Sequence, residues 1–160
     1  MTTRVFFEAY LLQLAVVAAK RGTCSKRQVG AVVADANKQI VAVSYNGPPQ
    51  GQPHCIDKPC LAMQMSAPQS HLACRSIHAE ANALLQAGSR ARGGTMAITT
   101  TPCYACALLI ANQGISTLVV GDLNRLYDAE GRDVGYSESP RLLLESAGVT
   151  VIAIFGDPSE

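Results

Sequence analysis

The sequence predicts an α/β fold in which a five-stranded mixed sheet is covered by helices on both faces. In the second half of the chain, apolar β-branched runs alternate with helical patterns, which indicates parallel strands joined by right-handed crossovers. In the first half, two such runs are separated only by a polar turn, which is typical of an antiparallel hairpin. A length of 160 residues suits one domain, and we expect that domain to span residues 1–160.

The first half of the chain begins with a helix and the hairpin. Residues 4–21 are expected to form a mostly buried helix, because Glu8 and Gln13 interrupt the apolar run and the run is shorter than the roughly 20 residues of a membrane span. The strands QVGAVVAD (28–35) and IVAVSYNG (40–47) follow, joined by the turn DANKQ. Residues 45–74 are rich in Gly, Pro, Cys and His, and we expect an irregular excursion there.

The second half alternates helices and strands. IHAEANALLQAG (77–88) predicts a helix that ends near Gly88. TMAITTT (95–101) and STLVVGD (116–122) predict strands on either side of a helix, PCYACALLIANQG (102–114), that Pro102 opens. SPRLLLESAG (139–148) predicts a helix with Ser139 as its N-cap and Pro140 at its first position, before a last strand, VTVIAIF (149–155).

Composition favours a protein that acts on a small molecule over one that binds nucleic acid. Apolar residues make up 48% of the chain and charged residues 16%, which is typical of an ordered globule. The net charge of +1 provides no basic surface for duplex nucleic acid, and 5% aromatic residues without Trp leave few platforms for stacking on single strands. No targeting or membrane segment is recognised, so we expect a cytoplasmic protein with reduced thiols.

Three metal-binding residues are predicted to lie at the starts of two helices. His78 is in the first turn of one helix, and Cys103 and Cys106 are three residues apart, and hence on one face, in the first turn of the next. A helix amino terminus stabilises thiolates. Two Cys and one His make a three-ligand zinc set that leaves the fourth position to water, as catalytic zinc sites do.

Glu80 completes the predicted site. It follows His78 by two residues, close enough to act as a proton carrier for a water whose pKa zinc lowers from about 16 to about 7. H-x-E followed by P-C-x-x-C is the signature of zinc-dependent nucleobase deaminases, and the chain has it at 78–80 and 102–106. A buried core histidine at position 78 is the alternative, but it does not explain the paired cysteines.

Four stretches resemble the deoxycytidylate deaminase family, including bacterial members known as late-competence ComE operon proteins: GTCSKRQVGAVV, YNGPPQGQPHC, CRSIHAEANALL and TTTPCYACALLIANQGISTLVV. The similarity runs from about residue 5 to residue 154. It implies a cytidine deaminase-like three-layer α/β/α sandwich, and His78, Cys103 and Cys106 as zinc ligands with Glu80 as proton shuttle. It also implies hydrolysis of dCMP to dUMP and ammonia, which supplies dUMP for thymidylate synthesis.

The resemblance further implies a homo-oligomer, often a hexamer, and control by dCTP as activator and dTTP as inhibitor. The loop NGPPQGQPHC, beside the expected sugar site, is the region expected to take part in this control.

The resemblance also points to substrate contacts. Asn46 matches the family position that binds the sugar hydroxyl, although a turn residue before a glycine is the alternative. The N–H group of Ala79 and the groups around Thr101 and Pro102 are expected to frame the base. Tyr127 resembles a family tyrosine near the nucleotide, with an ordinary loop tyrosine as the alternative.

The 5′-phosphate requires cationic side chains and free N–H groups. Lys26, Arg27 and Arg75 are the candidates, and a solvated surface charge is the alternative for each.

The other cysteines and histidines all lie in or beside the excursion: Cys24, Cys55, Cys60, Cys74, His54 and His71. Four Cys, or three with one His, would satisfy a closed tetrahedral zinc site and fasten a segment with little core of its own. Some family members have a second, structural zinc near this loop, and Cys24 and Cys55 resemble its ligand positions. Free thiols or disulfides are the alternatives, and the choice between Cys74 and His71 stays open.

Two other functions remain possible on sequence grounds. The same motif pair occurs in deaminases of free cytidine, guanine, tRNA adenosine and single-stranded DNA. Alternatively, the protein is a non-catalytic zinc-binding accessory factor. Glu80 argues against this, because a purely structural zinc does not need a carboxylate beside an open coordination position.

Overall fold

A computed structural model describes residues 4–65, 73–121 and 139–154 and shows the predicted mixed sheet. Its five strands lie in the order β2-β1-β3-β4-β5. β1 is antiparallel to both β2 and β3, whereas β3, β4 and β5 are parallel to one another. The strands are β1 (Gly30–Ala34), β2 (Ile40–Tyr45), β3 (Thr95–Ile98), β4 (Thr117–Val120) and β5 (Thr150–Ala153).

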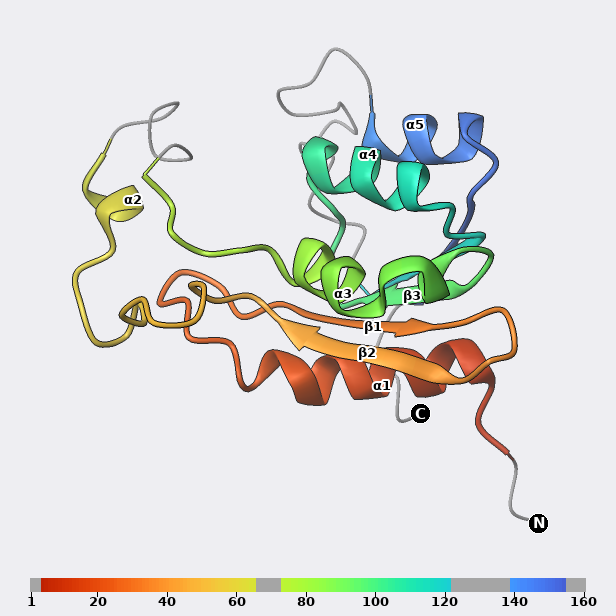
Figure 1. The fold of residues 1–160 in the computed structure, drawn as a ribbon, viewed down its shortest axis with the longest axis horizontal. Helices are drawn as coiled ribbons and strands as arrows, with labels where there is room; N and C mark the ends of the chain where they lie inside the picture. Colours follow the sequence, from red (N-terminus) through yellow and green to blue (C-terminus); the bar gives the residue numbers. More distant parts are fainter. Residues whose placement is uncertain (1–3, 66–72, 122–138, 155–160) are drawn as a thin grey trace.

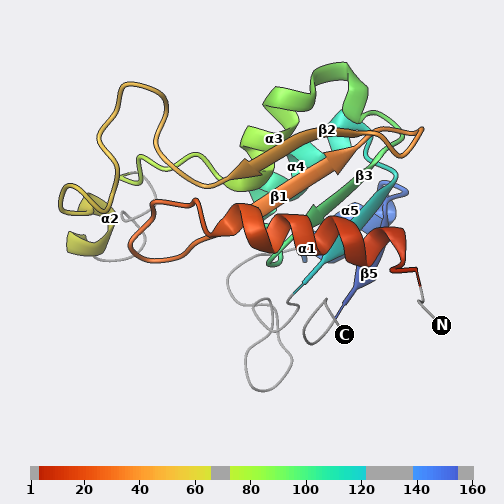
Figure 2. The ribbon, with the colours of Figure 1, turned by 90° about the horizontal axis from the view of Figure 1, so that it is seen from below.

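Helices cover both faces of the sheet, which confirms the three-layer α/β/α architecture (Figure 1). Helix α1 (Phe7–Ala19) lies below the sheet in this view and crosses in front of the strands in Figure 2. The opposite face carries α3 (Ala79–Ala87), α4 (Tyr104–Gln113) and α5 (Pro140–Ser146).

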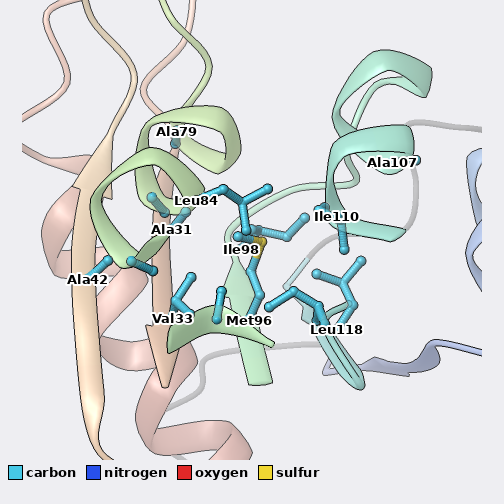
Figure 3. Packing of buried hydrophobic residues seen from close by; sticks show 14 of the residues in the cluster. Ala31, Val33, Ala42, Ala79, Leu84, Met96, Ile98, Ala107, Ile110 and Leu118 are labelled. Carbon is cyan, nitrogen blue, oxygen red and sulfur yellow. The ribbon is translucent and has the colours of Figure 1, made fainter. Parts of the chain in front are cut away.

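The two cores follow from the alternation of side chains along each strand. In β1, Val32 packs with α1 while Ala31 and Val33 pack with the opposite helices. The larger core gathers side chains from four strands and three helices, and Figure 3 shows its centre, where Met96 and Ile98 of β3 lie near Ile110 of α4. Helices α3 and α4, at whose starts the predicted metal ligands lie, are therefore fixed to the sheet by buried apolar contacts.

Residues 48–65 and 73–75 lie beyond one end of the sandwich, at the left of Figures 1 and 2, and are the described part of the predicted irregular excursion. It contains one short helix that was not predicted, α2 (Leu61–Gln64), and α2 has no buried residues. Two side-chain contacts connect the excursion with the segment before β1: Thr23 Oγ1 to His54 Nδ1 at 2.9 Å, and the Ser25 hydroxyl to Met63 Sδ at 3.8 Å.

The helix boundaries differ from the prediction where a residue caps the helix instead of entering it. The first helix begins at Phe7 and ends at Ala19, inside the predicted range 4–21. His78 and Cys103 are the N-caps of α3 and α4, with extended backbone at ψ 147° and 166°. A short 3-10 helix, η2 (Gly88–Ala91), follows α3 and was not predicted. Within the described ranges, no helix is long and apolar enough to cross a membrane.

The backbone of α1 touches β1 at Gly30. A Cβ atom at this position would lie 1.9 Å from the carbonyl oxygen of Ala15 and 2.7 Å from the nitrogen of Ala19. Both are backbone atoms, so neither can move without moving the helix. Gly30 therefore sets the distance between the first helix and the sheet.

We expect Gly30→Ala to lower the free energy of unfolding by about 3 kcal/mol, because the added methyl group forces α1 away from β1. Urea unfolding of the zinc-loaded protein measures this. Gly47→Ala is the matched control, since the nearest atom to a Cβ there is the Thr23 hydroxyl oxygen at an ordinary 3.5 Å. Equal losses in the two variants would contradict the close approach at Gly30.

Candidate metal centre

The three predicted ligands lie together in the structure. The Nδ1 atom of His78 is 3.5 Å from the Sγ atom of Cys103 and 3.5 Å from that of Cys106. All three ligand atoms lie within 4.8 Å of one another, and no other such group of three His, Cys, Asp or Glu side chains occurs in the described part of the chain. The sequence motifs therefore correspond to one compact site.

Two helix starts on the same face of the sheet bring these ligands together. His78 caps α3, and Cys103 caps α4 directly after the loop that follows β3. Cys106 lies in the first turn of α4 and is buried. The first N–H groups of a helix have no partner inside it, and their positive end favours thiolates. His78 is exposed, so the site opens toward solvent on that side.

The geometry fits zinc. Tetrahedral zinc with bonds of about 2.3 Å to sulfur and 2.0–2.1 Å to nitrogen places those ligand atoms about 3.6 Å apart. Both nitrogen–sulfur distances at this site are 3.5 Å. A set of two Cys and one His is also that of catalytic zinc sites, which keep a fourth position open.

One thiol of the ligand set is strongly acidic. The hydrogen bond from Cys106, followed by the one from His78, lowers the pKa of the Cys103 thiol to about 4. The same bond raises the pKa of Cys106, whose proton is held against the Cys103 thiolate. Hydrogen bonding to Cys103 also raises the pKa of His78. A metal ion that binds here must displace the protons of Cys106 and His78.

Glu80 is the one buried carboxylate among the described residues, with 4% of its surface exposed. Burial raises its pKa, and the positive charge of His78 opposes that shift while the charge of Cys103 adds to it. These interactions place the carboxyl group near the ligand set. A carboxyl group in such surroundings can hold a proton and release it, as a general acid–base must.

Asn46 lies just after β2 and is buried. Its Oδ1 atom accepts a hydrogen bond from the N–H of Val29 at 2.8 Å, and its Nδ2 atom donates to the carbonyl of Arg27 at 2.8 Å. Asn46 thus fixes the loop that enters β1. This structural role is separate from the predicted hydrogen bond between Asn46 and the sugar hydroxyl.

Of the three candidate cations, Arg27 makes a hydrogen bond with the loop that leads to Cys103. Its Nη2 atom donates to Thr100 Oγ1 at 2.7 Å, and Thr100 precedes Cys103 by three residues. Arg75 instead points into the excursion, where it donates to the carbonyl of Pro59 at 3.4 Å. Lys26 is exposed.

The residues predicted to frame the base are close in the chain to the metal ligands. Ala79 is the first residue of α3 and Pro102 directly precedes the cap of α4, and both are buried. Thr101 lies beside Pro102. Tyr127 falls outside the described residues.

The second predicted cysteine group is only loosely assembled. Cys24, Cys55, Cys60 and Cys74 are all free thiols, as are the other two cysteines. Burial raises the pKa of Cys55, the charges of Cys60, Cys24 and Cys74 raise it further, and the charge of Arg75 lowers it. They do not form a group of three ligand atoms within 4.8 Å. His54 contacts Thr23, and His71 is outside the described residues.

Sequence reasoning did not single out Thr100 or Asn82. Thr100 binds Arg27, and Asn82 in α3 donates from Nδ2 to the carbonyl of Tyr45 at 3.3 Å. Their partners are 73 and 37 residues away. The motif H-x-E-x-N contains Asn82, but nothing in the local pattern indicates what its amide binds.

Comparison with known proteins places the chain in a family. The family model described as "Cytidine and deoxycytidylate deaminase zinc-binding region" matches residues 7–122. The chain is similar to the deoxycytidylate deaminase of Saccharomyces cerevisiae, with 32% identity over 92% of this chain and 45% of that protein. It is also similar to ComE operon protein 2 of Bacillus subtilis, with 33% identity over 92% of this chain and 70% of that protein.

Solved structures agree on the fold. The dCMP deaminase of cyanophage S-TIM5, crystallised with dCMP and dUMP, superposes with a TM-score of 0.71 at 24% identity, over 96% of this chain and 100% of that chain. The chain spans less than half of the length of the yeast relatives that it matches. Because the family model covers most of the chain and includes both zinc-binding motifs, the chain belongs to the cytidine and deoxycytidylate deaminase family.

Proposed function

We propose that the protein is a zinc-dependent hydrolase that converts dCMP and water to dUMP and ammonia. The observation that carries this proposal is the compact group of His78, Cys103 and Cys106 with the buried carboxyl group of Glu80 beside it. Relatives from S. cerevisiae and Mycobacterium phage D29, both named deoxycytidylate deaminase, support the choice of substrate at 32% and 36% identity. The product would supply dUMP for thymidylate synthesis.

In this proposal His78, Cys103 and Cys106 would hold zinc, which would supply an activated water molecule at neutral pH. Glu80 would take a proton from that water and deliver it to N3 of cytosine while the water oxygen bonds to C4. The remaining proton of that oxygen would pass through Glu80 to the amino group, and the bond from C4 to the amino nitrogen would break, so that ammonia leaves and a C4 carbonyl remains. The raised pKa of Glu80 suits both transfers, because the carboxyl group must accept and release protons near neutral pH.

The base and the sugar would lie between the two helix starts and the end of β2. The N–H of Ala79 and the groups of Thr101 and Pro102 would frame the base, and Asn46 would bind the sugar hydroxyl. The amide of Asn46 already holds Val29 and Arg27, so a nucleotide would dock against a side chain of fixed orientation. Tyr127 is proposed to approach the nucleotide from the segment outside the described residues.

We expect the purified protein to release ammonia from dCMP, and far less from deoxycytidine, CMP or dCTP. Glu80→Gln should lower kcat about a thousandfold, because the amide cannot transfer protons, while folding and zinc content stay unchanged. Glu145→Gln is the matched control, since Glu145 is exposed and pairs with Arg141 far from the site in sequence. Ammonia release, with zinc per chain measured on each preparation, gives both results.

An active Glu80→Gln variant would refute the mechanism. Zinc-loaded protein that releases no ammonia from any of the four substrates would refute the proposed function. It would favour a base or nucleic-acid deaminase or a non-catalytic zinc protein.

Arg27 is the proposed phosphate-binding residue, because it is the candidate cation that contacts the loop leading to Cys103. We expect Arg27→Gln to lower kcat/KM for dCMP about a hundredfold, which corresponds to the loss of a charge-assisted hydrogen bond, and to leave the slow turnover of deoxycytidine unchanged. Arg27→Lys keeps the charge and should retain part of the preference for dCMP. Lys26→Gln is the control for charge alone. Equal losses on dCMP and deoxycytidine would assign Arg27 a purely structural role.

We further propose a second, structural zinc held by Cys24, Cys55, Cys60 and Cys74, with His71 or His54 as an alternative ligand. The support is the chemistry of the donors and the electrostatic influence of the three other thiols on the buried Cys55. Binding would draw the thiols together and fasten an excursion whose helix α2 buries no residue.

Zinc analysis tests the second site. We expect about two zinc ions per chain, and about one in Cys55→Ser, which should keep its catalytic zinc. Cys103→Ser is the complementary variant, because it should keep the structural zinc and lose deaminase activity. A wild-type ratio near one would contradict the second site.

Homo-oligomer formation, for example as a hexamer, is proposed on the family resemblance, together with dCTP activation, dTTP inhibition and a cytoplasmic location. Large exposed apolar side chains on three helices are consistent with subunit contacts: Phe6 and Val17 near or on α1, Leu85 on α3, and Leu108 and Leu109 on α4.

The proposed regulation is tested by the dependence of the rate on dCMP concentration. Non-sigmoidal saturation that neither dCTP nor dTTP changes would count against the regulation.

A further inference from the structure

The amide of Asn82 joins helix α3 to the end of strand β2. Its Nδ2 atom donates to the carbonyl of Tyr45, the last residue of β2, at 3.3 Å. Its Oδ1 atom accepts from Nε2 of Gln86, one turn further along α3, at 3.2 Å. The side chain of Asn82 is therefore oriented from two sides.

A second connection joins the same two segments just before the helix. Gly47 and Ile77 form an isolated antiparallel bridge, with N–H to carbonyl distances of 3.2 Å and 2.8 Å. Ile77 directly precedes His78. The end of β2 is thus attached to the start of α3 at Ile77 and at Asn82, and both His78 and Glu80 lie between these two points.

The end of β2 continues toward the cysteine side of the site. Asn46 lies between Tyr45 and Gly47 and holds the carbonyl of Arg27. Arg27 in turn donates to Thr100, in the loop that leads to Cys103. A chain of hydrogen bonds therefore runs from α3, through the end of β2, to the start of α4.

We propose that Asn82 is a positioning residue, which holds the first turn of α3 so that Glu80 stays aligned with the metal ligands and with the nucleotide that Asn46 contacts. Asn82 itself touches neither metal nor substrate in this proposal, which rests on the proposed deaminase function. Helix propensity does not explain an asparagine here, because Leu and Ala are both better helix formers than Asn. The contact with Tyr45 is what the amide adds.

The test is Asn82→Leu, which keeps side-chain size but cannot donate to Tyr45. We expect kcat for dCMP to fall about 10- to 100-fold, as a slightly misplaced catalytic group does, with KM within about threefold of wild type. Zinc per chain and the midpoint of thermal unfolding should stay at the wild-type values. Gln86→Leu is the matched control in the same helix, and it should keep full kcat because the bond to Tyr45 remains.

Asn82→Ala is measured alongside, because it removes the donor without adding bulk. Wild-type kcat in both Asn82 variants would overturn the proposal, and so would a loss of zinc or of thermal stability in both, since the role would then be structural. Wild-type protein that fails to deaminate dCMP would refute the proposed function instead of the role of Asn82. Zinc content near the wild-type value in all variants would show that a loss of activity is not a loss of metal, so the two failures can be distinguished.

Discussion

The close approach of two helix amino termini on one face of the sheet is the constraint on which the rest of the site depends. His78 and Cys103 both occupy N-cap positions, where the backbone is extended. The parallel arrangement of β3 and β4 places α4 on the same face as α3, and buried apolar residues hold both helices in place. The packing of the two helices therefore brings the three ligands together.

The site combines opposite electrostatic environments at its two helix starts. Helix termini and hydrogen bonds favour the thiolate of Cys103, whereas burial favours the neutral form of Glu80. One group is thus prepared to bind a cation and the other to carry a proton. The two groups sit at the starts of different helices, and the charge of Cys103 adds to the shift in the pKa of Glu80.

Local patterns in the sequence were enough to predict the sheet and the ligand set. The β-branched runs and the caps reflect contacts between near neighbours, and the structure confirms the five strands. The grouping of His78, Cys103 and Cys106 was predicted from the residue types of two motifs, although His78 is 25 residues from Cys103. Side-chain contacts between residues far apart in the chain have no such local pattern in the sequence. Asn82 meets Tyr45 across 37 residues and Arg27 meets Thr100 across 73, so neither pair could be predicted from spacing. The short helix α2 was also missed, because it has no buried face to give it periodicity.

The separation of the ligands along the chain has a consequence for how the protein acquires its metal. An unfolded chain offers a metal ion the local pair Cys103 and Cys106, while the third ligand, His78, is 25 residues from Cys103. That histidine reaches the pair only after β3 has joined the sheet and α3 has docked on it. Complete coordination of the ion therefore requires the folded tertiary structure. A nascent or damaged chain binds the ion more weakly than the folded protein.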